Sequence, residues 1–77
     1  MRQEVLNILV DILGNLDFSK ETGLLTDEVF DSYDIILFQA AVSEKLCIEI
    51  EIEDITEENF NSYEAICRYL ETQQEKL

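Results

Sequence analysis

The sequence contains no histidine, proline or tryptophan, and it has only two cysteines and two glycines among 77 residues. Without histidine there is no imidazole to complete a His-based triad, to shuttle protons or to bind a metal. Two cysteines alone cannot close a zinc site, nor do they form the cysteine-rich framework of a small secreted domain. A chain of 9.0 kDa also rarely has room for a cleft with paired carboxylates. We therefore expect that the chain is not itself an enzyme and that it has no metal site.

Basic residues are also scarce, because five Lys and Arg stand against eighteen Asp and Glu, a net charge of −13. Such a surface repels nucleic-acid phosphates and favours a basic protein partner. Hydrophobic residues make up 47% of the chain and charged residues 30%, which is typical of a folded domain. No long apolar run and no signal-like segment is visible. The sequence thus predicts one cytoplasmic, monomeric domain over residues 1–77 with no membrane insertion.

The first predicted helix runs from Arg2 to Leu16, and Gly14 or Asn15 can end it with a left-handed residue. Its apolar stripe consists of Val5, Leu6, Leu9, Ile12, Leu13 and Leu16. The stretch from Lys20 to Asp31 has no sustained periodicity and predicts a long loop, which in a small domain is often functional. We expect four apolar residues to pin this loop to the core, namely Leu24, Leu25, Val29 and Phe30.

The second predicted helix begins at Asp31 or Ser32, because Asp31 followed by Asp34 three residues later resembles a capping box. Its apolar stripe consists of Ile35, Phe38, Ala41, Val42 and Leu46. Three further apolar residues, Ile36, Leu37 and Ala40, fall outside this stripe. The middle of this helix is therefore apolar on more than one side.

The segment from Cys47 to Ile55 alternates isoleucine with glutamate, which is a strand pattern. A single strand has nothing to pair with, so we interpret the segment as an extended acidic loop. Thr56 can cap one helical turn over Glu57–Phe60, and Ser62 can cap a last helix through a capping box. The inner face of that helix comprises Tyr63, Ile66, Cys67 and Leu70, and the polar tail from Glu71 is expected to fray. The predicted fold is an all-α, up-and-down bundle of three main helices plus one short helix.

The segment GLLTDEVFDSYDII, residues 23–36, resembles the acyl and peptidyl carrier protein family. The attachment motif of that family is Asp-Ser-Leu, or Asp-Ser-Phe in a subset that includes the D-alanyl carrier proteins. The resemblance continues through Leu46–Ile50 and Glu53–Phe60, and the first helix also fits in place and length. An Asp-Ser dipeptide alone is weak evidence. Its place between a long loop and an apolar helix, with an acidic loop downstream, makes the resemblance stronger.

The resemblance implies a freestanding carrier whose Ser32 hydroxyl is esterified by the 4′-phosphopantetheine of coenzyme A. The thiol of this arm then holds an acyl or aminoacyl group as a thioester, with Asp31 in a supporting role. Three partners are implied: a phosphopantetheinyl transferase, a loading ligase or adenylating enzyme, and a downstream acyltransferase or synthase. The position also suits a phosphodiester, because backbone N–H groups at a helix start lack partners and favour anions.

The sequence departs from the family pattern at several positions. Glu28 and Cys47 stand where glycine is frequent, Leu37 replaces an acid, and Tyr33 replaces the Leu or Phe that follows the serine. Because the second helix is apolar where carriers are often acidic, we predict a partner-binding surface with an apolar centre and a thin acidic rim. The apolar residues of this surface are Tyr33, Ile36, Leu37 and Ala40, and the rim residues are Asp34 and Glu44.

Other interpretations of the acidic segments are possible. An EF-hand loop aligned from Asp27 has the wrong residues at Val29, Ser32 and Phe38, which excludes it. The alternative function is a small acidic protein–protein interaction module, or a degenerate carrier without the arm. Every pattern described above except the context of Ser32 would satisfy that alternative.

Overall fold

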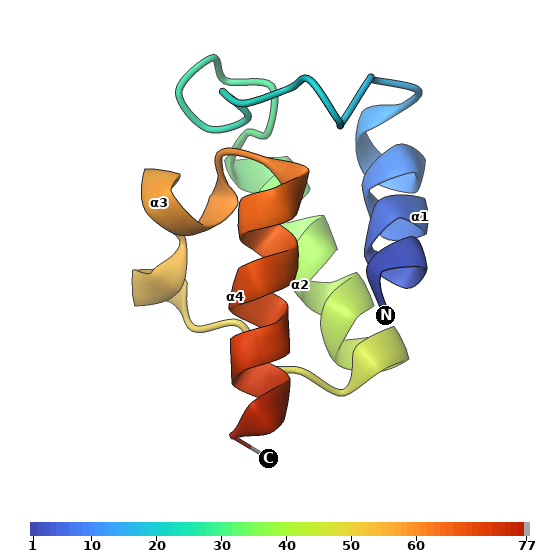
Figure 1. The fold of residues 1–77 in the computed structure, drawn as a ribbon, viewed down its shortest axis with the longest axis vertical. Helices are drawn as coiled ribbons and strands as arrows, with labels where there is room; N and C mark the ends of the chain where they lie inside the picture. Colours follow the sequence, from blue (N-terminus) through green and yellow to red (C-terminus); the bar gives the residue numbers. More distant parts are fainter. Residues whose placement is uncertain (77) are drawn as a thin grey trace.

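Four α-helices and one 3-10 turn build the fold over residues 1–76, the residues that the computed structural model describes. They are α1 (Arg2–Leu13), α2 (Ser32–Leu46), η1 (Ile52–Asp54), α3 (Glu57–Phe60) and α4 (Tyr63–Glu75). In Figure 1, α1 runs upward and α2 downward, the chain climbs back through η1 and α3, and α4 descends. No strand forms within residues 1–76, so the predicted all-α bundle of three main helices and one short helix is confirmed.

Two helix ends differ from the prediction. α1 ends at Leu13, because Gly14 adopts a φ of +86°, and this leaves Leu16 outside the helix and exposed. α4 continues to Glu75, so the predicted fraying from Glu71 is wrong. Its last turns are held from the other end of the chain, since Arg2 Nε donates to Glu71 Oε2 at 3.0 Å.

The core forms where the three long helices meet the two long connections. Phe60 is at the centre of an aromatic cluster, with ring centroids 6.5 Å from Phe30, 6.3 Å from Phe38 and 5.4 Å from Tyr69. Seven buried residues were absent from the predicted stripes, namely Ile8, Phe18, Ile48, Ile50, Phe60, Ala65 and Tyr69. The aromatic cluster joins the loop before α2 to α2, α3 and α4, so it fixes where α2 begins.

The long loop before α2 is pinned as predicted, with Leu24 and Phe30 buried and Leu25 and Val29 half-buried. Its backbone is also held by Asn61, which precedes α4. Asn61 O accepts the N–H of Leu24 at 2.9 Å, and Asn61 Oδ1 accepts the N–H of Leu25 at 2.8 Å. This bridge joins segments about 35 residues apart, and it places the loop against the start of α4.

The beginning of α1 is attached to α4 by one arginine. The Arg2 guanidinium donates to the carboxylates of Glu64 and Glu71 at 3.0–3.1 Å, and Tyr63 Oη donates to Arg2 O at 2.9 Å. The hydrogen bonds from Arg2 hold the pKa of Glu64 below its usual range. The start of α1 is therefore held against α4 by one polar cluster of four residues, Arg2, Tyr63, Glu64 and Glu71.

Two tyrosines, the buried Tyr69 and the half-buried Tyr63, lead us to expect that the fold loses stability in strong alkali. Burial raises the pKa of both Tyr63 and Tyr69 to about 12. Unfolded tyrosine ionises near pH 10, so between about pH 10 and 12 the unfolded chain releases protons that the folded chain keeps. The stabilisation that comes from keeping these protons is therefore fully present below about pH 10 and is lost as the pH rises to about 12. The free energy of unfolding should fall by on the order of 1–3 kcal/mol per tyrosine.

Urea unfolding at about pH 9 and about pH 11 measures this loss. Tyr63→Phe and Tyr69→Phe should each show a smaller fall in unfolding free energy between the two pH values than the parent chain. The Cys67 thiol, whose pKa burial also raises, interacts with Tyr63 and not with Tyr69, so its contribution is equal in the parent chain and in Tyr69→Phe. An equal fall in the variants and the parent would contradict the prediction.

Candidate functional site

Ser32 is the first residue of α2, and its side chain is exposed. The preceding residue, Asp31, caps the helix: its Oδ1 accepts the N–H of Asp34 at 2.9 Å, and its carbonyl accepts the N–H of Ile35 at 2.9 Å. The predicted start of the helix is thus confirmed. Because Asp31 provides the cap, the Ser32 hydroxyl is not required for it and projects at the helix terminus.

Two other serines use their hydroxyls locally. Ser62 caps α4, where its Oγ accepts the N–H of Ala65 at 3.1 Å, and Ser19 Oγ donates to the carboxylate of Asp17. Ser43 is exposed in the last part of α2, away from the helix start. Ser32 therefore differs from these residues in its combination of exposure, helix-terminal position and an adjacent capping acid.

An apolar groove of about 280 Å³ begins at Ser32 and lies between α2 and the η1 region. It is lined by Ser32, Ile35, Ile36, Gln39, Ile52 and Ile55. Gln39 Nε2 donates to Ile50 O at 3.1 Å, which ties the two walls together. No sequence pattern predicted this groove, because Ile35 fits the core stripe of its helix and Ile52 and Ile55 lie in the segment predicted to be an extended acidic loop.

The predicted partner-binding residues lie together on the exposed side of α2. Tyr33 is 67% exposed, Ile36 62% and Leu37 39%, and Ala40 is also exposed. Their spacing along the helix places them on neighbouring turns of one surface. Of the two rim residues, Glu44 is exposed and Asp34 is half-buried. Ile36 belongs both to this surface, which we call the α2 face, and to the groove.

Acidic groups surround the groove on both sides. Asp31 is exposed beside Ser32, and Glu51 and Glu53 flank Ile52. Acidic groups in these positions disfavour the binding of free anions in the groove. Among residues 1–76, no three Asp, Glu or Cys side chains come together as a potential metal centre.

Two departures from the carrier pattern coincide with unusual backbone geometry. Glu28 has a φ of 57° and Cys47 a φ of 59°, and within residues 1–76 they are the only non-glycine residues with a positive φ. Cys47 terminates α2, where its N–H donates to Ser43 O at 3.2 Å. Glycine adopts this conformation without steric cost, whereas other residues pay about 1–2 kcal/mol.

The sequence places Cys67 on the inner face of the last helix, and the structure agrees. Cys67 is buried on the inner face of α4, where burial raises the pKa of its thiol, and Cys47 is exposed. Burial and a raised pKa make Cys67 a poor nucleophile. Neither cysteine lines the groove that begins at Ser32.

Comparisons of this chain with protein-family models, curated proteins and solved structures give no match. Within the described part of the chain, no helix has both the length and the apolar character needed to cross a membrane. Any functional assignment therefore rests on the geometry around Ser32.

Proposed function

We propose that the chain is a carrier domain that holds an acyl or aminoacyl group as a thioester on a 4′-phosphopantetheine arm attached to Ser32. The observation that supports this most is the combination found at Ser32. Its hydroxyl is exposed at the start of α2, Asp31 rather than Ser32 caps the helix, and an apolar groove begins at the same residue. An arm attached there could lay an apolar cargo along the groove.

The attachment is a phosphoryl transfer that a separate transferase performs. Ser32 Oγ attacks the coenzyme A phosphorus that bears the pantetheine and forms a new P–O ester bond. The P–O bond to the second phosphate breaks, 3′,5′-adenosine bisphosphate leaves, and the serine proton passes to a base of the transferase. The carrier's own contribution is to present the hydroxyl at an ordered helix terminus, with Asp31 Oδ1 occupied by the Asp34 N–H and the second carboxylate oxygen open to the transferase.

The electrostatics favour a covalent attachment over simple anion binding. The first backbone N–H groups of α2 and the helix dipole stabilise a phosphodiester. The net charge of −13 and the neighbouring Asp31 oppose it. A free phosphate would gain little from this balance, whereas an ester bond keeps the group in place regardless.

The backbone supports the family resemblance as well. Glu28 and Cys47, the two positions where the resemblance leads one to expect glycine, are the two non-glycine residues with positive φ among residues 1–76. A carrier-like backbone explains why these positions need this conformation. At both positions the chain has the positive φ that glycine adopts most easily, although neither residue is glycine.

Mass spectrometry tests the assignment directly. Incubation with coenzyme A and a broad-specificity phosphopantetheinyl transferase should add one phosphopantetheine to the parent chain and none to Ser32→Ala. Ser43→Ala is the matched control, because Ser43 is also an exposed serine of α2, and it should be modified like the parent. Modification of Ser32→Ala would refute the site. No modification of the parent by any transferase tried would favour the alternative, an acidic interaction module that uses the α2 face without an arm.

A further inference from the structure

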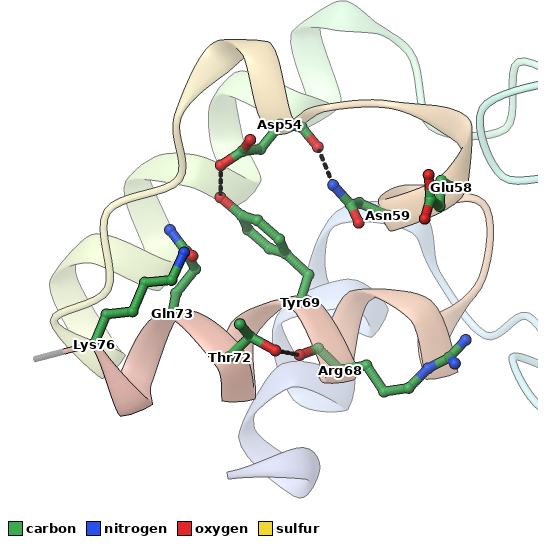
Figure 2. A pocket seen from close by; sticks show the side chains of 8 residues that line it. All are labelled: Asp54, Glu58, Asn59, Arg68, Tyr69, Thr72, Gln73 and Lys76. Carbon is green, nitrogen blue, oxygen red and sulfur yellow. Dashed lines mark hydrogen bonds between the residues drawn. The ribbon is translucent and has the colours of Figure 1, made fainter.

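Asp54 connects the η1 side of the groove to helices α3 and α4. It is the last residue of η1, which contributes Ile52 to the groove. Tyr69 Oη of α4 donates to Asp54 Oδ2 at 2.7 Å, and Asn59 Nδ2 of α3 donates to Asp54 O at 2.9 Å. Figure 2 shows both bonds converging on Asp54 within a polar pocket of about 310 Å³.

The η1 wall of the groove, which we define as residues 51–55, has no fully buried side chain to hold it. Ile50 before it and Phe60 after it are buried, but every residue from 51 to 59 is exposed or half-buried. Ile52 itself is 76% exposed. Where apolar burial is small, local opening is easy and the remaining hydrogen bonds determine the position of the backbone.

The bond from Tyr69 is well suited to hold this wall. The Tyr69 ring is buried against Phe60, so its hydroxyl has a fixed place. The acceptor is a carboxylate, and hydrogen bonds to charged acceptors are stronger than neutral ones. Burial also raises the pKa of Tyr69 to about 12, so the donor keeps its proton at physiological pH.

We infer that Tyr69 is a positioning residue that acts through Asp54 to hold the η1 wall of the groove, and so retains an apolar acyl cargo beside α2. The inference about cargo rests on the proposed carrier function. The groove of about 280 Å³ has room for on the order of nine water-sized groups, which suits a medium-length hydrocarbon chain. Its four isoleucines offer such a chain an apolar lining.

The first test uses the unmodified chain and does not depend on any arm. The amides of Asp54, Ile55 and Thr56 donate to Glu51 O, Ile52 O and Asp54 O, so their hydrogen exchange reports on the wall. In Tyr69→Phe these amides should exchange about tenfold faster or more. Tyr63→Phe is the matched control, because it removes a tyrosine hydroxyl bond of α4 that goes to Arg2 instead. Unchanged exchange in Tyr69→Phe, or an equal change in Tyr63→Phe, would overturn the inference.

The second test measures protection of a cargo. The transferase attaches octanoyl- or acetyl-phosphopantetheine to Ser32 from the corresponding acyl-coenzyme A, and cleavage of the thioester by hydroxylamine is followed by mass. We expect Tyr69→Phe to speed the cleavage of the octanoyl thioester severalfold but not that of the acetyl thioester, which is too short to occupy the groove. Asp54→Ala should act like Tyr69→Phe, and their double variant should be no worse than either. Asp54→Asn, which keeps a neutral acceptor, should fall between the parent chain and Asp54→Ala.

The two tests separate the two claims. If the parent chain accepts no arm, the carrier function fails, and the exchange measurement alone decides whether Tyr69 holds the wall. If loading succeeds but octanoyl cleavage is equal in the parent chain and Tyr69→Phe, the carrier function stands and the positioning role is refuted.

Discussion

Phe60→Ala is expected to bring the domain close to unfolding at room temperature. Phe60 is 1% exposed and contacts the rings of Phe30, Phe38 and Tyr69. Removing a buried phenylalanine side chain costs about 3–5 kcal/mol, because the cavity collapses only in part. A domain of 77 residues has a total stability of about 4–12 kcal/mol, so this loss consumes much of it.

The effect should also reach the site. Phe60 ends the single-turn helix α3, and Tyr69, which packs on it, holds Asp54. Urea unfolding monitored by circular dichroism measures the loss. Phe60→Leu, which loses the ring but keeps a large branched apolar side chain, should cost clearly less than Phe60→Ala and serves as the control. A loss below about 1 kcal/mol in Phe60→Ala would show that the aromatic cluster is not the centre of the core.

The helix starts could be predicted from the sequence because their bonds are local. Asp31, Thr56 and Ser62 each accept the N–H of the residue three positions later, as their residue types indicated. The apolar spacing likewise predicted Phe38 and Val42 as buried residues of α2. Interactions that span one helical turn can be predicted from the sequence without knowledge of the fold.

The features that position the groove were not predictable in this way. Asn61 holds a loop about 35 residues earlier, and Arg2 reaches Glu71 across 69 residues. The 3-10 turn at Ile52 breaks the period of two in the isoleucine pattern, so Ile48 and Ile50 are buried while Ile52 leaves the core. Such contacts depend on how distant elements meet, and no local pattern encodes them.

The residues of the predicted partner surface are exposed except for the half-buried Asp34, and their role in binding a partner stays a prediction. Tyr33, Ile36 and Leu37 complete no part of the buried core. Their exposure on a helix that starts at Ser32 is what an encounter surface for a loading enzyme requires. An exposed apolar cluster beside a proposed attachment site is favoured as an interaction site over scattered surface residues.

We therefore expect Tyr33→Ala and Leu37→Ala to slow loading by the cognate ligase or acyltransferase more than Glu44→Gln does. Burying one large apolar side chain at an interface contributes about 1.5–3 kcal/mol, whereas an exposed charge pair contributes under about 1 kcal/mol. The apolar variants should thus lower the loading efficiency by about 10- to 100-fold, and Glu44→Gln by less than about fivefold. The charge mainly affects the encounter rate, so its small effect should shrink further as salt is added.

The measurement is the loading rate of each variant against carrier concentration, after mass spectrometry has confirmed equal attachment of the arm. Leu16→Ala is the matched control for Leu37→Ala, because Leu16 is 38% exposed and Leu37 39%, but Leu16 lies after α1, outside the α2 face. Circular dichroism must show an intact fold for all four variants. If Glu44→Gln is the most damaging, recognition depends on charge. If Leu16→Ala matches Leu37→Ala, exposed apolar area matters regardless of its place, and the α2 face is not the docking surface.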